Sequence, residues 1–181
     1  MRIAVNATII DETPSGLGVY ASSLLKEMAA LHDDLFIYTS CPMDGSAKSV
    51  TIRPVTPLTR PSRGRWGHMT RLSWLQTVLP GRLLGDQATA LFCPVTEGLL
   101  FPFLPQVVVV HDLHPLLFPK FWPQQYYYFR YIVPSLLMRS KAIITDSETT
   151  RRDIARFYEL PADRISVIFP GYDLRGEPIR D

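Results

Sequence analysis

A run of four valines, Val107–Val110, constrains the fold more than any other feature of the sequence. An uninterrupted stretch of β-branched apolar residues is typical of a strand that is buried on both faces, and such strands belong to parallel sheets covered by helices. Shorter apolar runs recur along the chain and alternate with helical patterns. This alternation predicts an α/β fold built on a Rossmann-like, doubly wound parallel sheet.

The expected strands share apolar, β-branched composition and turn residues at their ends. They are Arg2–Ala7, Leu35–Thr39, Val50–Val55, Ala88–Cys93, Gln106–Val110, Lys141–Thr145 and Arg164–Phe169. Helical spacing of apolar residues predicts helices over Val19–Leu31, Trp66–Leu79, Trp122–Arg139 and Glu148–Tyr158. We expect Pro80-Gly81 to end the second helix, Pro134 to kink or split the third near Val133, and Ser147 to cap the fourth.

The length of 181 residues suits one domain, since domains usually hold roughly 100–200 residues. Pro170-Gly171 breaks the last expected strand, and the residues after it show no apolar periodicity. We therefore expect a Rossmann-like domain over residues 1–171 and a tail or linker over residues 172–181. Met1–Val5 reads directly as a strand rather than as a signal peptide, and Cys41 and Cys93 match no redox or metal-ligand spacing. These features favour a cytoplasmic protein with structural thiols and no metal.

The positive charge of the chain is unevenly distributed. The net charge is only +2, but no acidic residue lies between Asp44 and Asp86, a segment that contains Lys48 and six arginines. Such a basic segment usually forms a solvated surface, although it could also face phosphates or an anionic membrane.

Ligands of open α/β sheets bind beyond the carboxyl ends of the strands, so we searched the loops that follow strands. The first such loop is Pro14–Gly18, where Gly16 and Gly18 would let the backbone approach an anion at a helix N-terminus. A tight structural turn is the alternative. NAD or FAD binding is disfavoured, because the glycines lie far from Ala7 and no acid ends the second strand.

The second loop is His111–Pro115, directly after the valine strand. His111 and Asp112 could bind hydroxyls, act as acid or base, or polarise a leaving group, because imidazole titrates near neutrality. A histidine that satisfies nearby backbone groups is an equally good interpretation, whereas a metal site is less favoured. In the third loop, Pro94–Gly98, Glu97 could bind a hydroxylated acceptor or be simply exposed.

The segment from Phe118 to Tyr131 is unusually aromatic, with Lys120 and Arg130 among its aromatic residues. One helix face cannot bury so many consecutive rings, so a membrane interface, a partner surface or an acceptor groove is indicated. No nucleic-acid motif accompanies it, so we expect no nucleic-acid partner.

Taken in order, several fragments resemble the N-terminal domain of GT-B glycosyltransferases of family 4, the group 1 glycosyl and mannosyl transferases of bacterial polysaccharide synthesis. The fragments are Met1–Ala7, Ser15–Tyr20, Val107–Pro115, Asp146–Ile154 and Arg164–Asp173. The resemblance implies that Gly16, Leu17 and Gly18 approach the donor diphosphate and the acceptor. It also implies that His111 contacts the transferred sugar, with Asp112 beside it.

The resemblance further implies an enzyme that transfers a sugar from a nucleotide-sugar with retention of configuration, without a metal or other cofactor, to a glycan or lipid-linked acceptor. In this family a C-terminal donor domain carries the nucleotide pocket. We expect that domain to be missing here, so that the chain is inactive alone or works with a separate donor-domain chain. The alternative is a non-catalytic module of the same fold that binds an acceptor, the inner face of the membrane or a partner.

Overall fold

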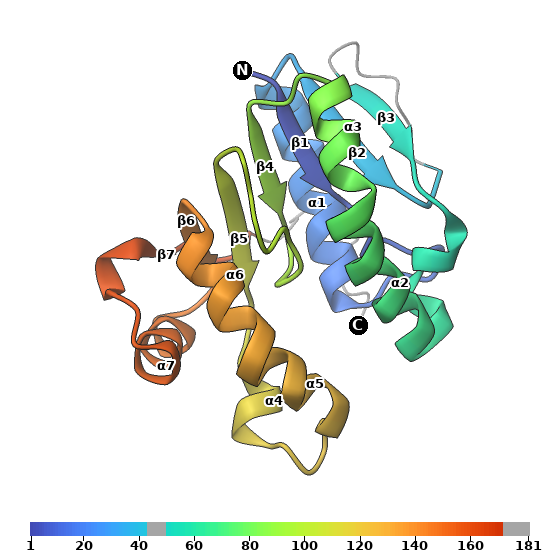
Figure 1. Ribbon diagram of the computed structural model, residues 1–181. Helices are drawn as coiled ribbons and strands as arrows, with labels where there is room; N and C mark the ends of the chain where they lie inside the picture. The colour runs from blue at the N-terminus through green and yellow to red at the C-terminus, as the bar shows by residue number, and fades with distance from the viewer. Residues whose placement is uncertain (43–49, 172–181) are drawn as a thin grey trace, which may run out of the picture.

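A seven-stranded, wholly parallel sheet organises the chain, in the order β3-β2-β1-β4-β5-β6-β7 (Figure 1). The computed structural model describes residues 1–42 and 50–171; Lys48 and the expected tail over residues 172–181 lie outside these ranges. The strands are β1 (Ile3–Asn6), β2 (Leu35–Thr39), β3 (Val50–Pro54), β4 (Ala90–Cys93), β5 (Gln106–Val110), β6 (Ala142–Thr145) and β7 (Ile165–Val167). The predicted α/β class and parallel sheet are confirmed.

The strand order reverses between β1 and β4. From β1 the chain moves outward through β2 to β3, and it then returns to place β4 on the other side of β1. Loops diverge at such a reversal, and a crevice opens there beyond the carboxyl ends of the strands. The loops after β1, β4, β5 and β6 therefore meet at one edge of the sheet.

Helices cover both faces of the sheet, as a doubly wound fold requires. One face packs against α1 (Gly16–Leu31), whose buried Ala21 and Leu25 lie among apolar side chains of β1 and β2. The other face carries α2 (Gly64–Thr77), α3 (Leu79–Gly85), α6 (Val133–Arg139) and α7 (Glu148–Tyr158). The sheet is thus the middle layer of three.

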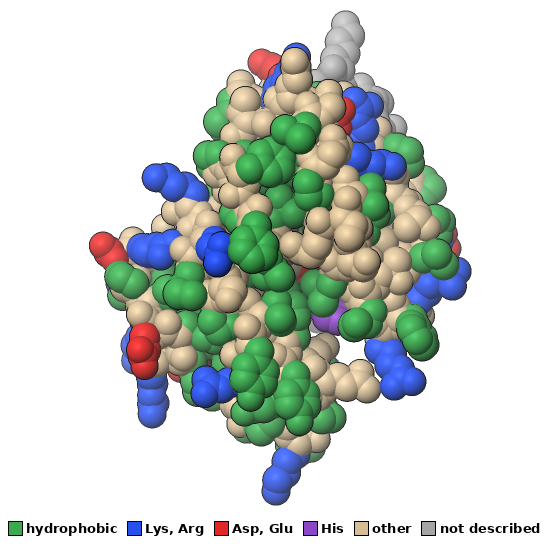
Figure 2. Space-filling model, viewed as in Figure 1, with side chains coloured by type: hydrophobic (Ala, Val, Ile, Leu, Met, Phe, Trp, Pro, Cys, Tyr) green, Lys and Arg blue, Asp and Glu red, His purple; other side chains and the backbone are tan. Residues whose placement is uncertain are grey.

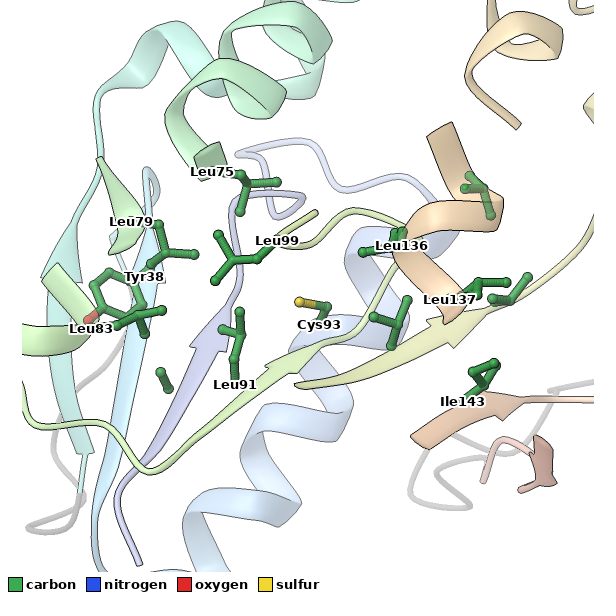
Figure 3. Close-up of a cluster of buried hydrophobic side chains, with 14 of the residues drawn as sticks. Tyr38, Leu75, Leu79, Leu83, Leu91, Cys93, Leu99, Leu136, Leu137 and Ile143 are labelled. Carbon is green, nitrogen blue, oxygen red and sulfur yellow. The ribbon is translucent and has the colours of Figure 1, made fainter. Parts of the chain in front are cut away.

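The larger core lies between the sheet and α2, α3 and α6 (Figure 3). Leu75, Leu79 and Leu83 recur at the spacing of one helical turn across α2 and α3, and all three are fully buried. Each such leucine stabilises the fold by about 2 kcal/mol through the apolar surface that it removes from water. They pack towards Tyr38 and Leu91, which point from β2 and β4 to the same face.

Proline positions explain one difference from the predicted helices and one agreement with them. Pro80 does not end the second helix, because it lies in the first turn of α3, where its missing N–H costs nothing. The chain from Pro123 to Arg139 is split as expected, since α6 begins at Val133 with Pro134 in its first turn. Before α6 come α5 (Pro123–Tyr127) and a π-helical turn, η3 (Tyr128–Ile132).

The remaining elements are short. They are α4 (His114–Leu117) and the 3-10 turns η1 (Pro57–Thr59), η2 (Pro61–Arg63) and η4 (Ala162–Arg164). The sequence patterns did not predict them, because a single turn is too short to show a period. Among the described residues, no helix has the length and apolar character needed to cross a membrane.

Candidate functional site

An open cleft of about 1180 Å³ lies at the carboxyl edge of the sheet. Its walls are α2, the loops after β4 and β5, and the aromatic segment that runs through α5 and η3. In Figure 2 a hollow opens between two lower lobes of the molecule, and a histidine side chain lies at its margin. The cleft is therefore where the topology predicts a ligand site.

A buried ion pair supports one wall of the cleft. Glu97 follows β4, and both its carboxylate oxygens accept from Arg71 of α2, Oε2 from Nε at 2.8 Å and Oε1 from a terminal nitrogen at 2.9 Å. Arg71 also donates to the carbonyl of Thr59 at 2.9 Å, which ties α2 to η1. His68, one turn earlier on α2, places Nδ1 3.0 Å from Glu97 Oε1. The four residues form one polar network inside the fold.

The charge of Glu97 is set by these contacts. Burial alone would raise the pKa of Glu97, but the hydrogen bonds from His68 and Arg71 and the positive charge of Arg71 outweigh it and lower the pKa to about 2. Glu97 is therefore a carboxylate at neutral pH. The interpretation that Glu97 is simply exposed was wrong, because its side chain is only 9% exposed. Glu97 is thus largely enclosed, although it still contributes to the lining of the cleft.

The π-helical turn brings an aromatic side chain onto the same network. Tyr128 donates its hydroxyl hydrogen to the carbonyl of Thr96 at 2.7 Å, and its ring packs edge-to-face against His68 with centroids 5.3 Å apart. Burial and the nearby charge of Glu97 raise the pKa of Tyr128 well above its usual value, so the hydroxyl stays protonated and keeps donating. Single π-helical turns often occur at functional sites, where the extra residue reorients side chains.

His111 lies at the end of β5 and contacts two acceptors. Its Nδ1 is 3.1 Å from Asp146 Oδ2, at the end of neighbouring β6, and its Nε2 is 3.0 Å from the carbonyl oxygen of Pro94. The contact with the Pro94 carbonyl is the one expected of a histidine that satisfies nearby backbone groups. The contact with the Asp146 carboxylate goes beyond that expectation. Both nitrogens can donate at once only when the ring is an imidazolium. Tyr20 of α1 packs on this ring with centroids 4.6 Å apart.

Asp112 lines the cleft but is turned away from His111. Its Oδ1 accepts from the backbone N–H of His114 at 3.0 Å, at the start of α4, and its Oδ2 lies 3.4 Å from Nδ1 of His114. The carboxylate that faces His111 therefore belongs to Asp146 and not to Asp112, the neighbour of His111 in sequence.

The predicted glycine loop is the first turn of α1. The helix begins at Gly16, with Ser15 as its N-cap, three residues earlier than the apolar period indicates. Gly18 is buried, and a Cβ atom there would lie 3.0 Å from the Cβ atom of Pro14, so glycine permits close packing. Leu17 lines the cleft. The first N–H groups of this helix have no partner within it, as at any helix start.

Half of the six arginines in the basic segment pair with acids from elsewhere in the sequence. Three arginines pair with acidic residues, and Arg82 donates to the backbone of Pro54; the pairs are Arg53 with Asp86, Arg60 with Glu12, and Arg71 with Glu97. Within the described part of the chain, Arg63 and Arg65 are exposed and form no ion pair. The basic and aromatic segments do lie next to one another, as the His68–Tyr128 contact shows.

Sequence reasoning missed three residues of this site. The sequence patterns place His68 and Arg71 only in the expected helix Trp66–Leu79 and the basic segment, and Asp146 only in the fragment Asp146–Ile154. Asp146 could have been found, because it directly follows β6 in the same way that His111 follows the adjacent β5. His68 and Arg71 are three residues apart and so share a helix face, but nothing in the sequence indicates Glu97 as their partner.

Comparisons with known proteins match different shares of this chain. A family model, Glycosyltransferase Family 4, matches residues 14–175. The O-antigen chain mannosyltransferase RfbU of Salmonella typhimurium is 34% identical over 64 residues, which are 35% of this chain and 18% of that protein. The crystal structure of Alr3699/HepE of Anabaena in complex with UDP-glucose superposes with a TM-score of 0.56 at 14% identity, over 96% of this chain and 44% of that protein.

These findings carry different weight. The structural likeness supports the fold alone, and the matched regions make up less than half of either protein. The family model covers nearly the whole chain, including α1, the cleft loops and α7. The chain therefore belongs to glycosyltransferase family 4.

Proposed function

We propose that this chain is the acceptor-binding, N-terminal half of a retaining glycosyltransferase that moves a sugar from a nucleotide-sugar to a glycan or lipid-linked acceptor in bacterial polysaccharide synthesis. The observation that carries the proposal is the open cleft at the carboxyl edge of the sheet, lined by His68, His111 and Asp112, in a chain of this family. The similar proteins include a mannosyltransferase and a protein crystallised with UDP-glucose. Both support a nucleotide-linked hexose as the donor.

Charge stabilisation is the physical core of the proposed step. As the bond between the anomeric carbon and the diphosphate breaks, negative charge develops on the leaving group, and preorganised donors lower the barrier. The N-terminal turn of α1, with Gly16, Leu17 and Gly18, offers backbone N–H groups to that charge. His111 takes the sugar-facing role, and Asp146 stabilises a positive ring beside the departing diphosphate. Asp112, exposed at the cleft, is available to a substrate hydroxyl.

We further propose that a donor domain, on the same chain or on a second one, supplies the nucleotide pocket, so that residues 1–181 alone transfer no sugar at a useful rate. The test compares the 181-residue chain with the same chain joined to a family 4 donor domain. The measurement is transfer of labelled glucose from UDP-glucose to a polyprenyl-diphosphate-linked glycan. The joined enzyme should turn over with the donor's anomeric configuration retained in the product.

His111→Ala in the joined enzyme should lower transfer at least about 100-fold, the usual range for a positioned acid–base or charge-stabilising group. His32→Ala is the matched control, because His32 is exposed beyond the end of α1 and does not line the cleft. Circular dichroism verifies that both variants fold. Full turnover by His111→Ala would remove that residue from the catalytic machinery, and no transfer by the joined wild type would overturn the proposed function.

An exposed apolar surface supports a second proposal, peripheral contact with the inner face of the membrane. Phe121 is 81% exposed and Trp66 is 71% exposed, and the exposed cations Lys120 and Arg65 lie one residue from them in sequence. Figure 2 shows hydrophobic side chains gathered on the lower lobe of the molecule, with a cation at its tip. Co-sedimentation should be stronger with anionic vesicles than with neutral ones; equal binding would contradict the proposal.

A further inference from the structure

We propose that His68 is an acceptor-binding residue whose Nε2 accepts a hydrogen bond from a hydroxyl of a sugar ring lying against Tyr128 and Trp122. The inference rests on the proposed function, because it names the chemical group that the same cleft holds. It assigns His68 a contact with substrate that neither its sequence context nor its place in the basic segment indicates.

The tautomer of His68 follows from its partners. Nδ1 lies 3.0 Å from Glu97 Oε1, and a carboxylate can only accept, so Nδ1 carries the proton. A terminal nitrogen of Arg71 lies 3.5 Å from the same Nδ1, but that guanidinium already donates to Glu97 at 2.9 Å. A neutral ring protonated on Nδ1 has its lone pair on Nε2. Glu97 therefore fixes the tautomer in which a neutral His68 ring presents Nε2 as an acceptor.

Nε2 of His68 is also available to a ligand. No described residue places a group within hydrogen-bonding distance of it, the side chain is 29% exposed, and the residue lines the cleft. His111 differs in this respect, because both of its nitrogens already face protein acceptors. Of these two cleft histidines, His68 has the ring nitrogen free to accept from a hydroxyl.

The surroundings of His68 suit a sugar rather than an anion or a purely apolar group. The Tyr128 ring stands edge-on to the imidazole at 5.3 Å, and Trp122, with 47% of its surface exposed, lines the same cleft. A pyranose presents a C–H face that packs on aromatic rings and hydroxyls around its rim that need polar partners. Because Glu97 is already paired with Arg71, the groups behind His68 add no net positive charge that would favour a phosphate.

Two variants separate ligand binding from packing. His68→Phe keeps a ring against Tyr128 and removes both nitrogens, and His68→Ala removes the ring. Glu97 keeps its two hydrogen bonds from Arg71 in either variant, so the buried carboxylate is not left unpaired. His32→Ala again serves as the remote histidine control.

The experiment is a titration of the isotope-labelled chain with methyl α-D-mannopyranoside and methyl β-D-glucopyranoside, followed by NMR of the imidazole nitrogens. We expect one glycoside or both to shift the Nε2 signal of His68 and leave His32 unchanged. His68→Phe and His68→Ala should each weaken glycoside binding at least about tenfold, with the His32→Ala affinity unchanged. Glycoside binding that is unaltered in His68→Phe, or a shift produced only by inorganic phosphate, would overturn the proposal.

Kinetics of the joined enzyme separate this inference from the proposed function. His68→Phe should raise the acceptor KM about tenfold or more, while the KM for UDP-glucose and the slow hydrolysis of UDP-glucose by water stay unchanged. A merely structural role would lower hydrolysis and transfer together. Sugar transfer with an unchanged acceptor KM would refute the role of His68 and leave the proposed function standing. If glycoside binding depends on His68 but the joined enzyme transfers no sugar, the role of His68 stands and the proposed function is refuted.

Discussion

Two of the histidines that line the cleft, His68 and His111, are held by different kinds of carboxylate partner. His68 rests on a carboxylate that is almost fully enclosed and paired with Arg71, whose side chain is 6% exposed. His111 rests on Asp146, whose side chain is 27% exposed. The first arrangement connects α2, η1 and the loop after β4, whereas the second connects the ends of two adjacent strands.

The difference lies in the cost of desolvation. An enclosed carboxylate is tolerable only while its partner remains, because an unpaired buried charge is expensive. A partly solvated carboxylate keeps water as an alternative partner. The α2 wall, meaning α2 with its Arg71–Glu97 pair, should therefore be coupled strongly to global stability. The β5–β6 wall, meaning the His111–Asp146 pair at the carboxyl ends of these strands, can be altered at little cost to the fold.

Removing the buried cation should produce the largest effect. Arg71→Met keeps much of the apolar stem and leaves Glu97 without its main partner, so we expect a loss of about 3–5 kcal/mol in the free energy of unfolding. Arg151→Met is the matched control, because Arg151 pairs with Glu148 on the exposed face of α7. That control should lose at most about 0.5 kcal/mol. Urea denaturation measures both, and similar losses would erase the contrast between the walls.

Acid should weaken the α2 wall specifically. Contacts with His68 and Arg71 overcome the opposing effect of burial and lower the pKa of Glu97 from 4.5 to about 2. A lowered pKa means that the unfolded chain binds the proton more tightly, so this stabilisation is present above pH 4.5 and is lost as pH falls towards 2. It amounts to roughly 3 kcal/mol.

The acid effect is isolated with Glu97→Gln, since the pKa values of Asp11 and Asp86 are also lowered by their hydrogen-bond partners. Wild type and Glu97→Gln are compared by their free energies of unfolding. The part of the difference that arises from ionisation of Glu97 should shrink by roughly 3 kcal/mol between pH 5 and pH 2. A difference that does not change with pH would show that the carboxylate charge contributes nothing.

The sequence predicted the β5–β6 wall better than the α2 wall, and the reason is physical. The strands were recognisable by their apolar runs, and parallel pairing brings their carboxyl ends to one edge, so His111 could be placed without any long-range information. The partner of His111 follows the adjacent strand and was within reach of the same argument. Asp112, the neighbour of His111 in sequence, contacts His114 instead.

The α2 wall depends on a tertiary contact that leaves no periodic signal. Arg71 and Glu97 are 26 residues apart, and their pairing requires the chain reversal between β3 and β4. Apolar periodicity shows which face of a helix is buried, and it assigns an arginine of that helix to the exposed surface. The start of α1 was missed for a related reason, because glycines weaken the helical signal although Gly16 and Gly18 are helical here.

Backbone proximity gives a third test of the α2 wall. A Cβ atom at Gly67 would lie only 2.1 Å from the carbonyl oxygen of Arg60, so α2 could not keep its place against η2. Gly67→Ala should therefore destabilise by about 1–3 kcal/mol and disturb His68, the next residue. Gly81→Ala is the control, because nothing lies within 4 Å of that position in α3, and alanine there should be neutral or stabilising. Thermal unfolding of both variants decides whether the close approach matters.

The smallest effect is expected at the helix that adjoins the β5–β6 wall. Ser147 caps α7 by accepting from the backbone N–H of Thr150 at 3.0 Å, and the Thr150 hydroxyl donates to the carbonyl of His111 at 3.1 Å. Ser147→Ala should cost about 1 kcal/mol, the usual value of an N-cap, whereas Ser23→Ala on the exposed side of α1 should cost nothing. Because Asp146 precedes the cap, its contact with His111 should loosen, which a change in the imidazole NMR signals of His111 would reveal. A Ser147→Ala loss as large as that of Arg71→Met would mean that both walls are equally coupled to the fold.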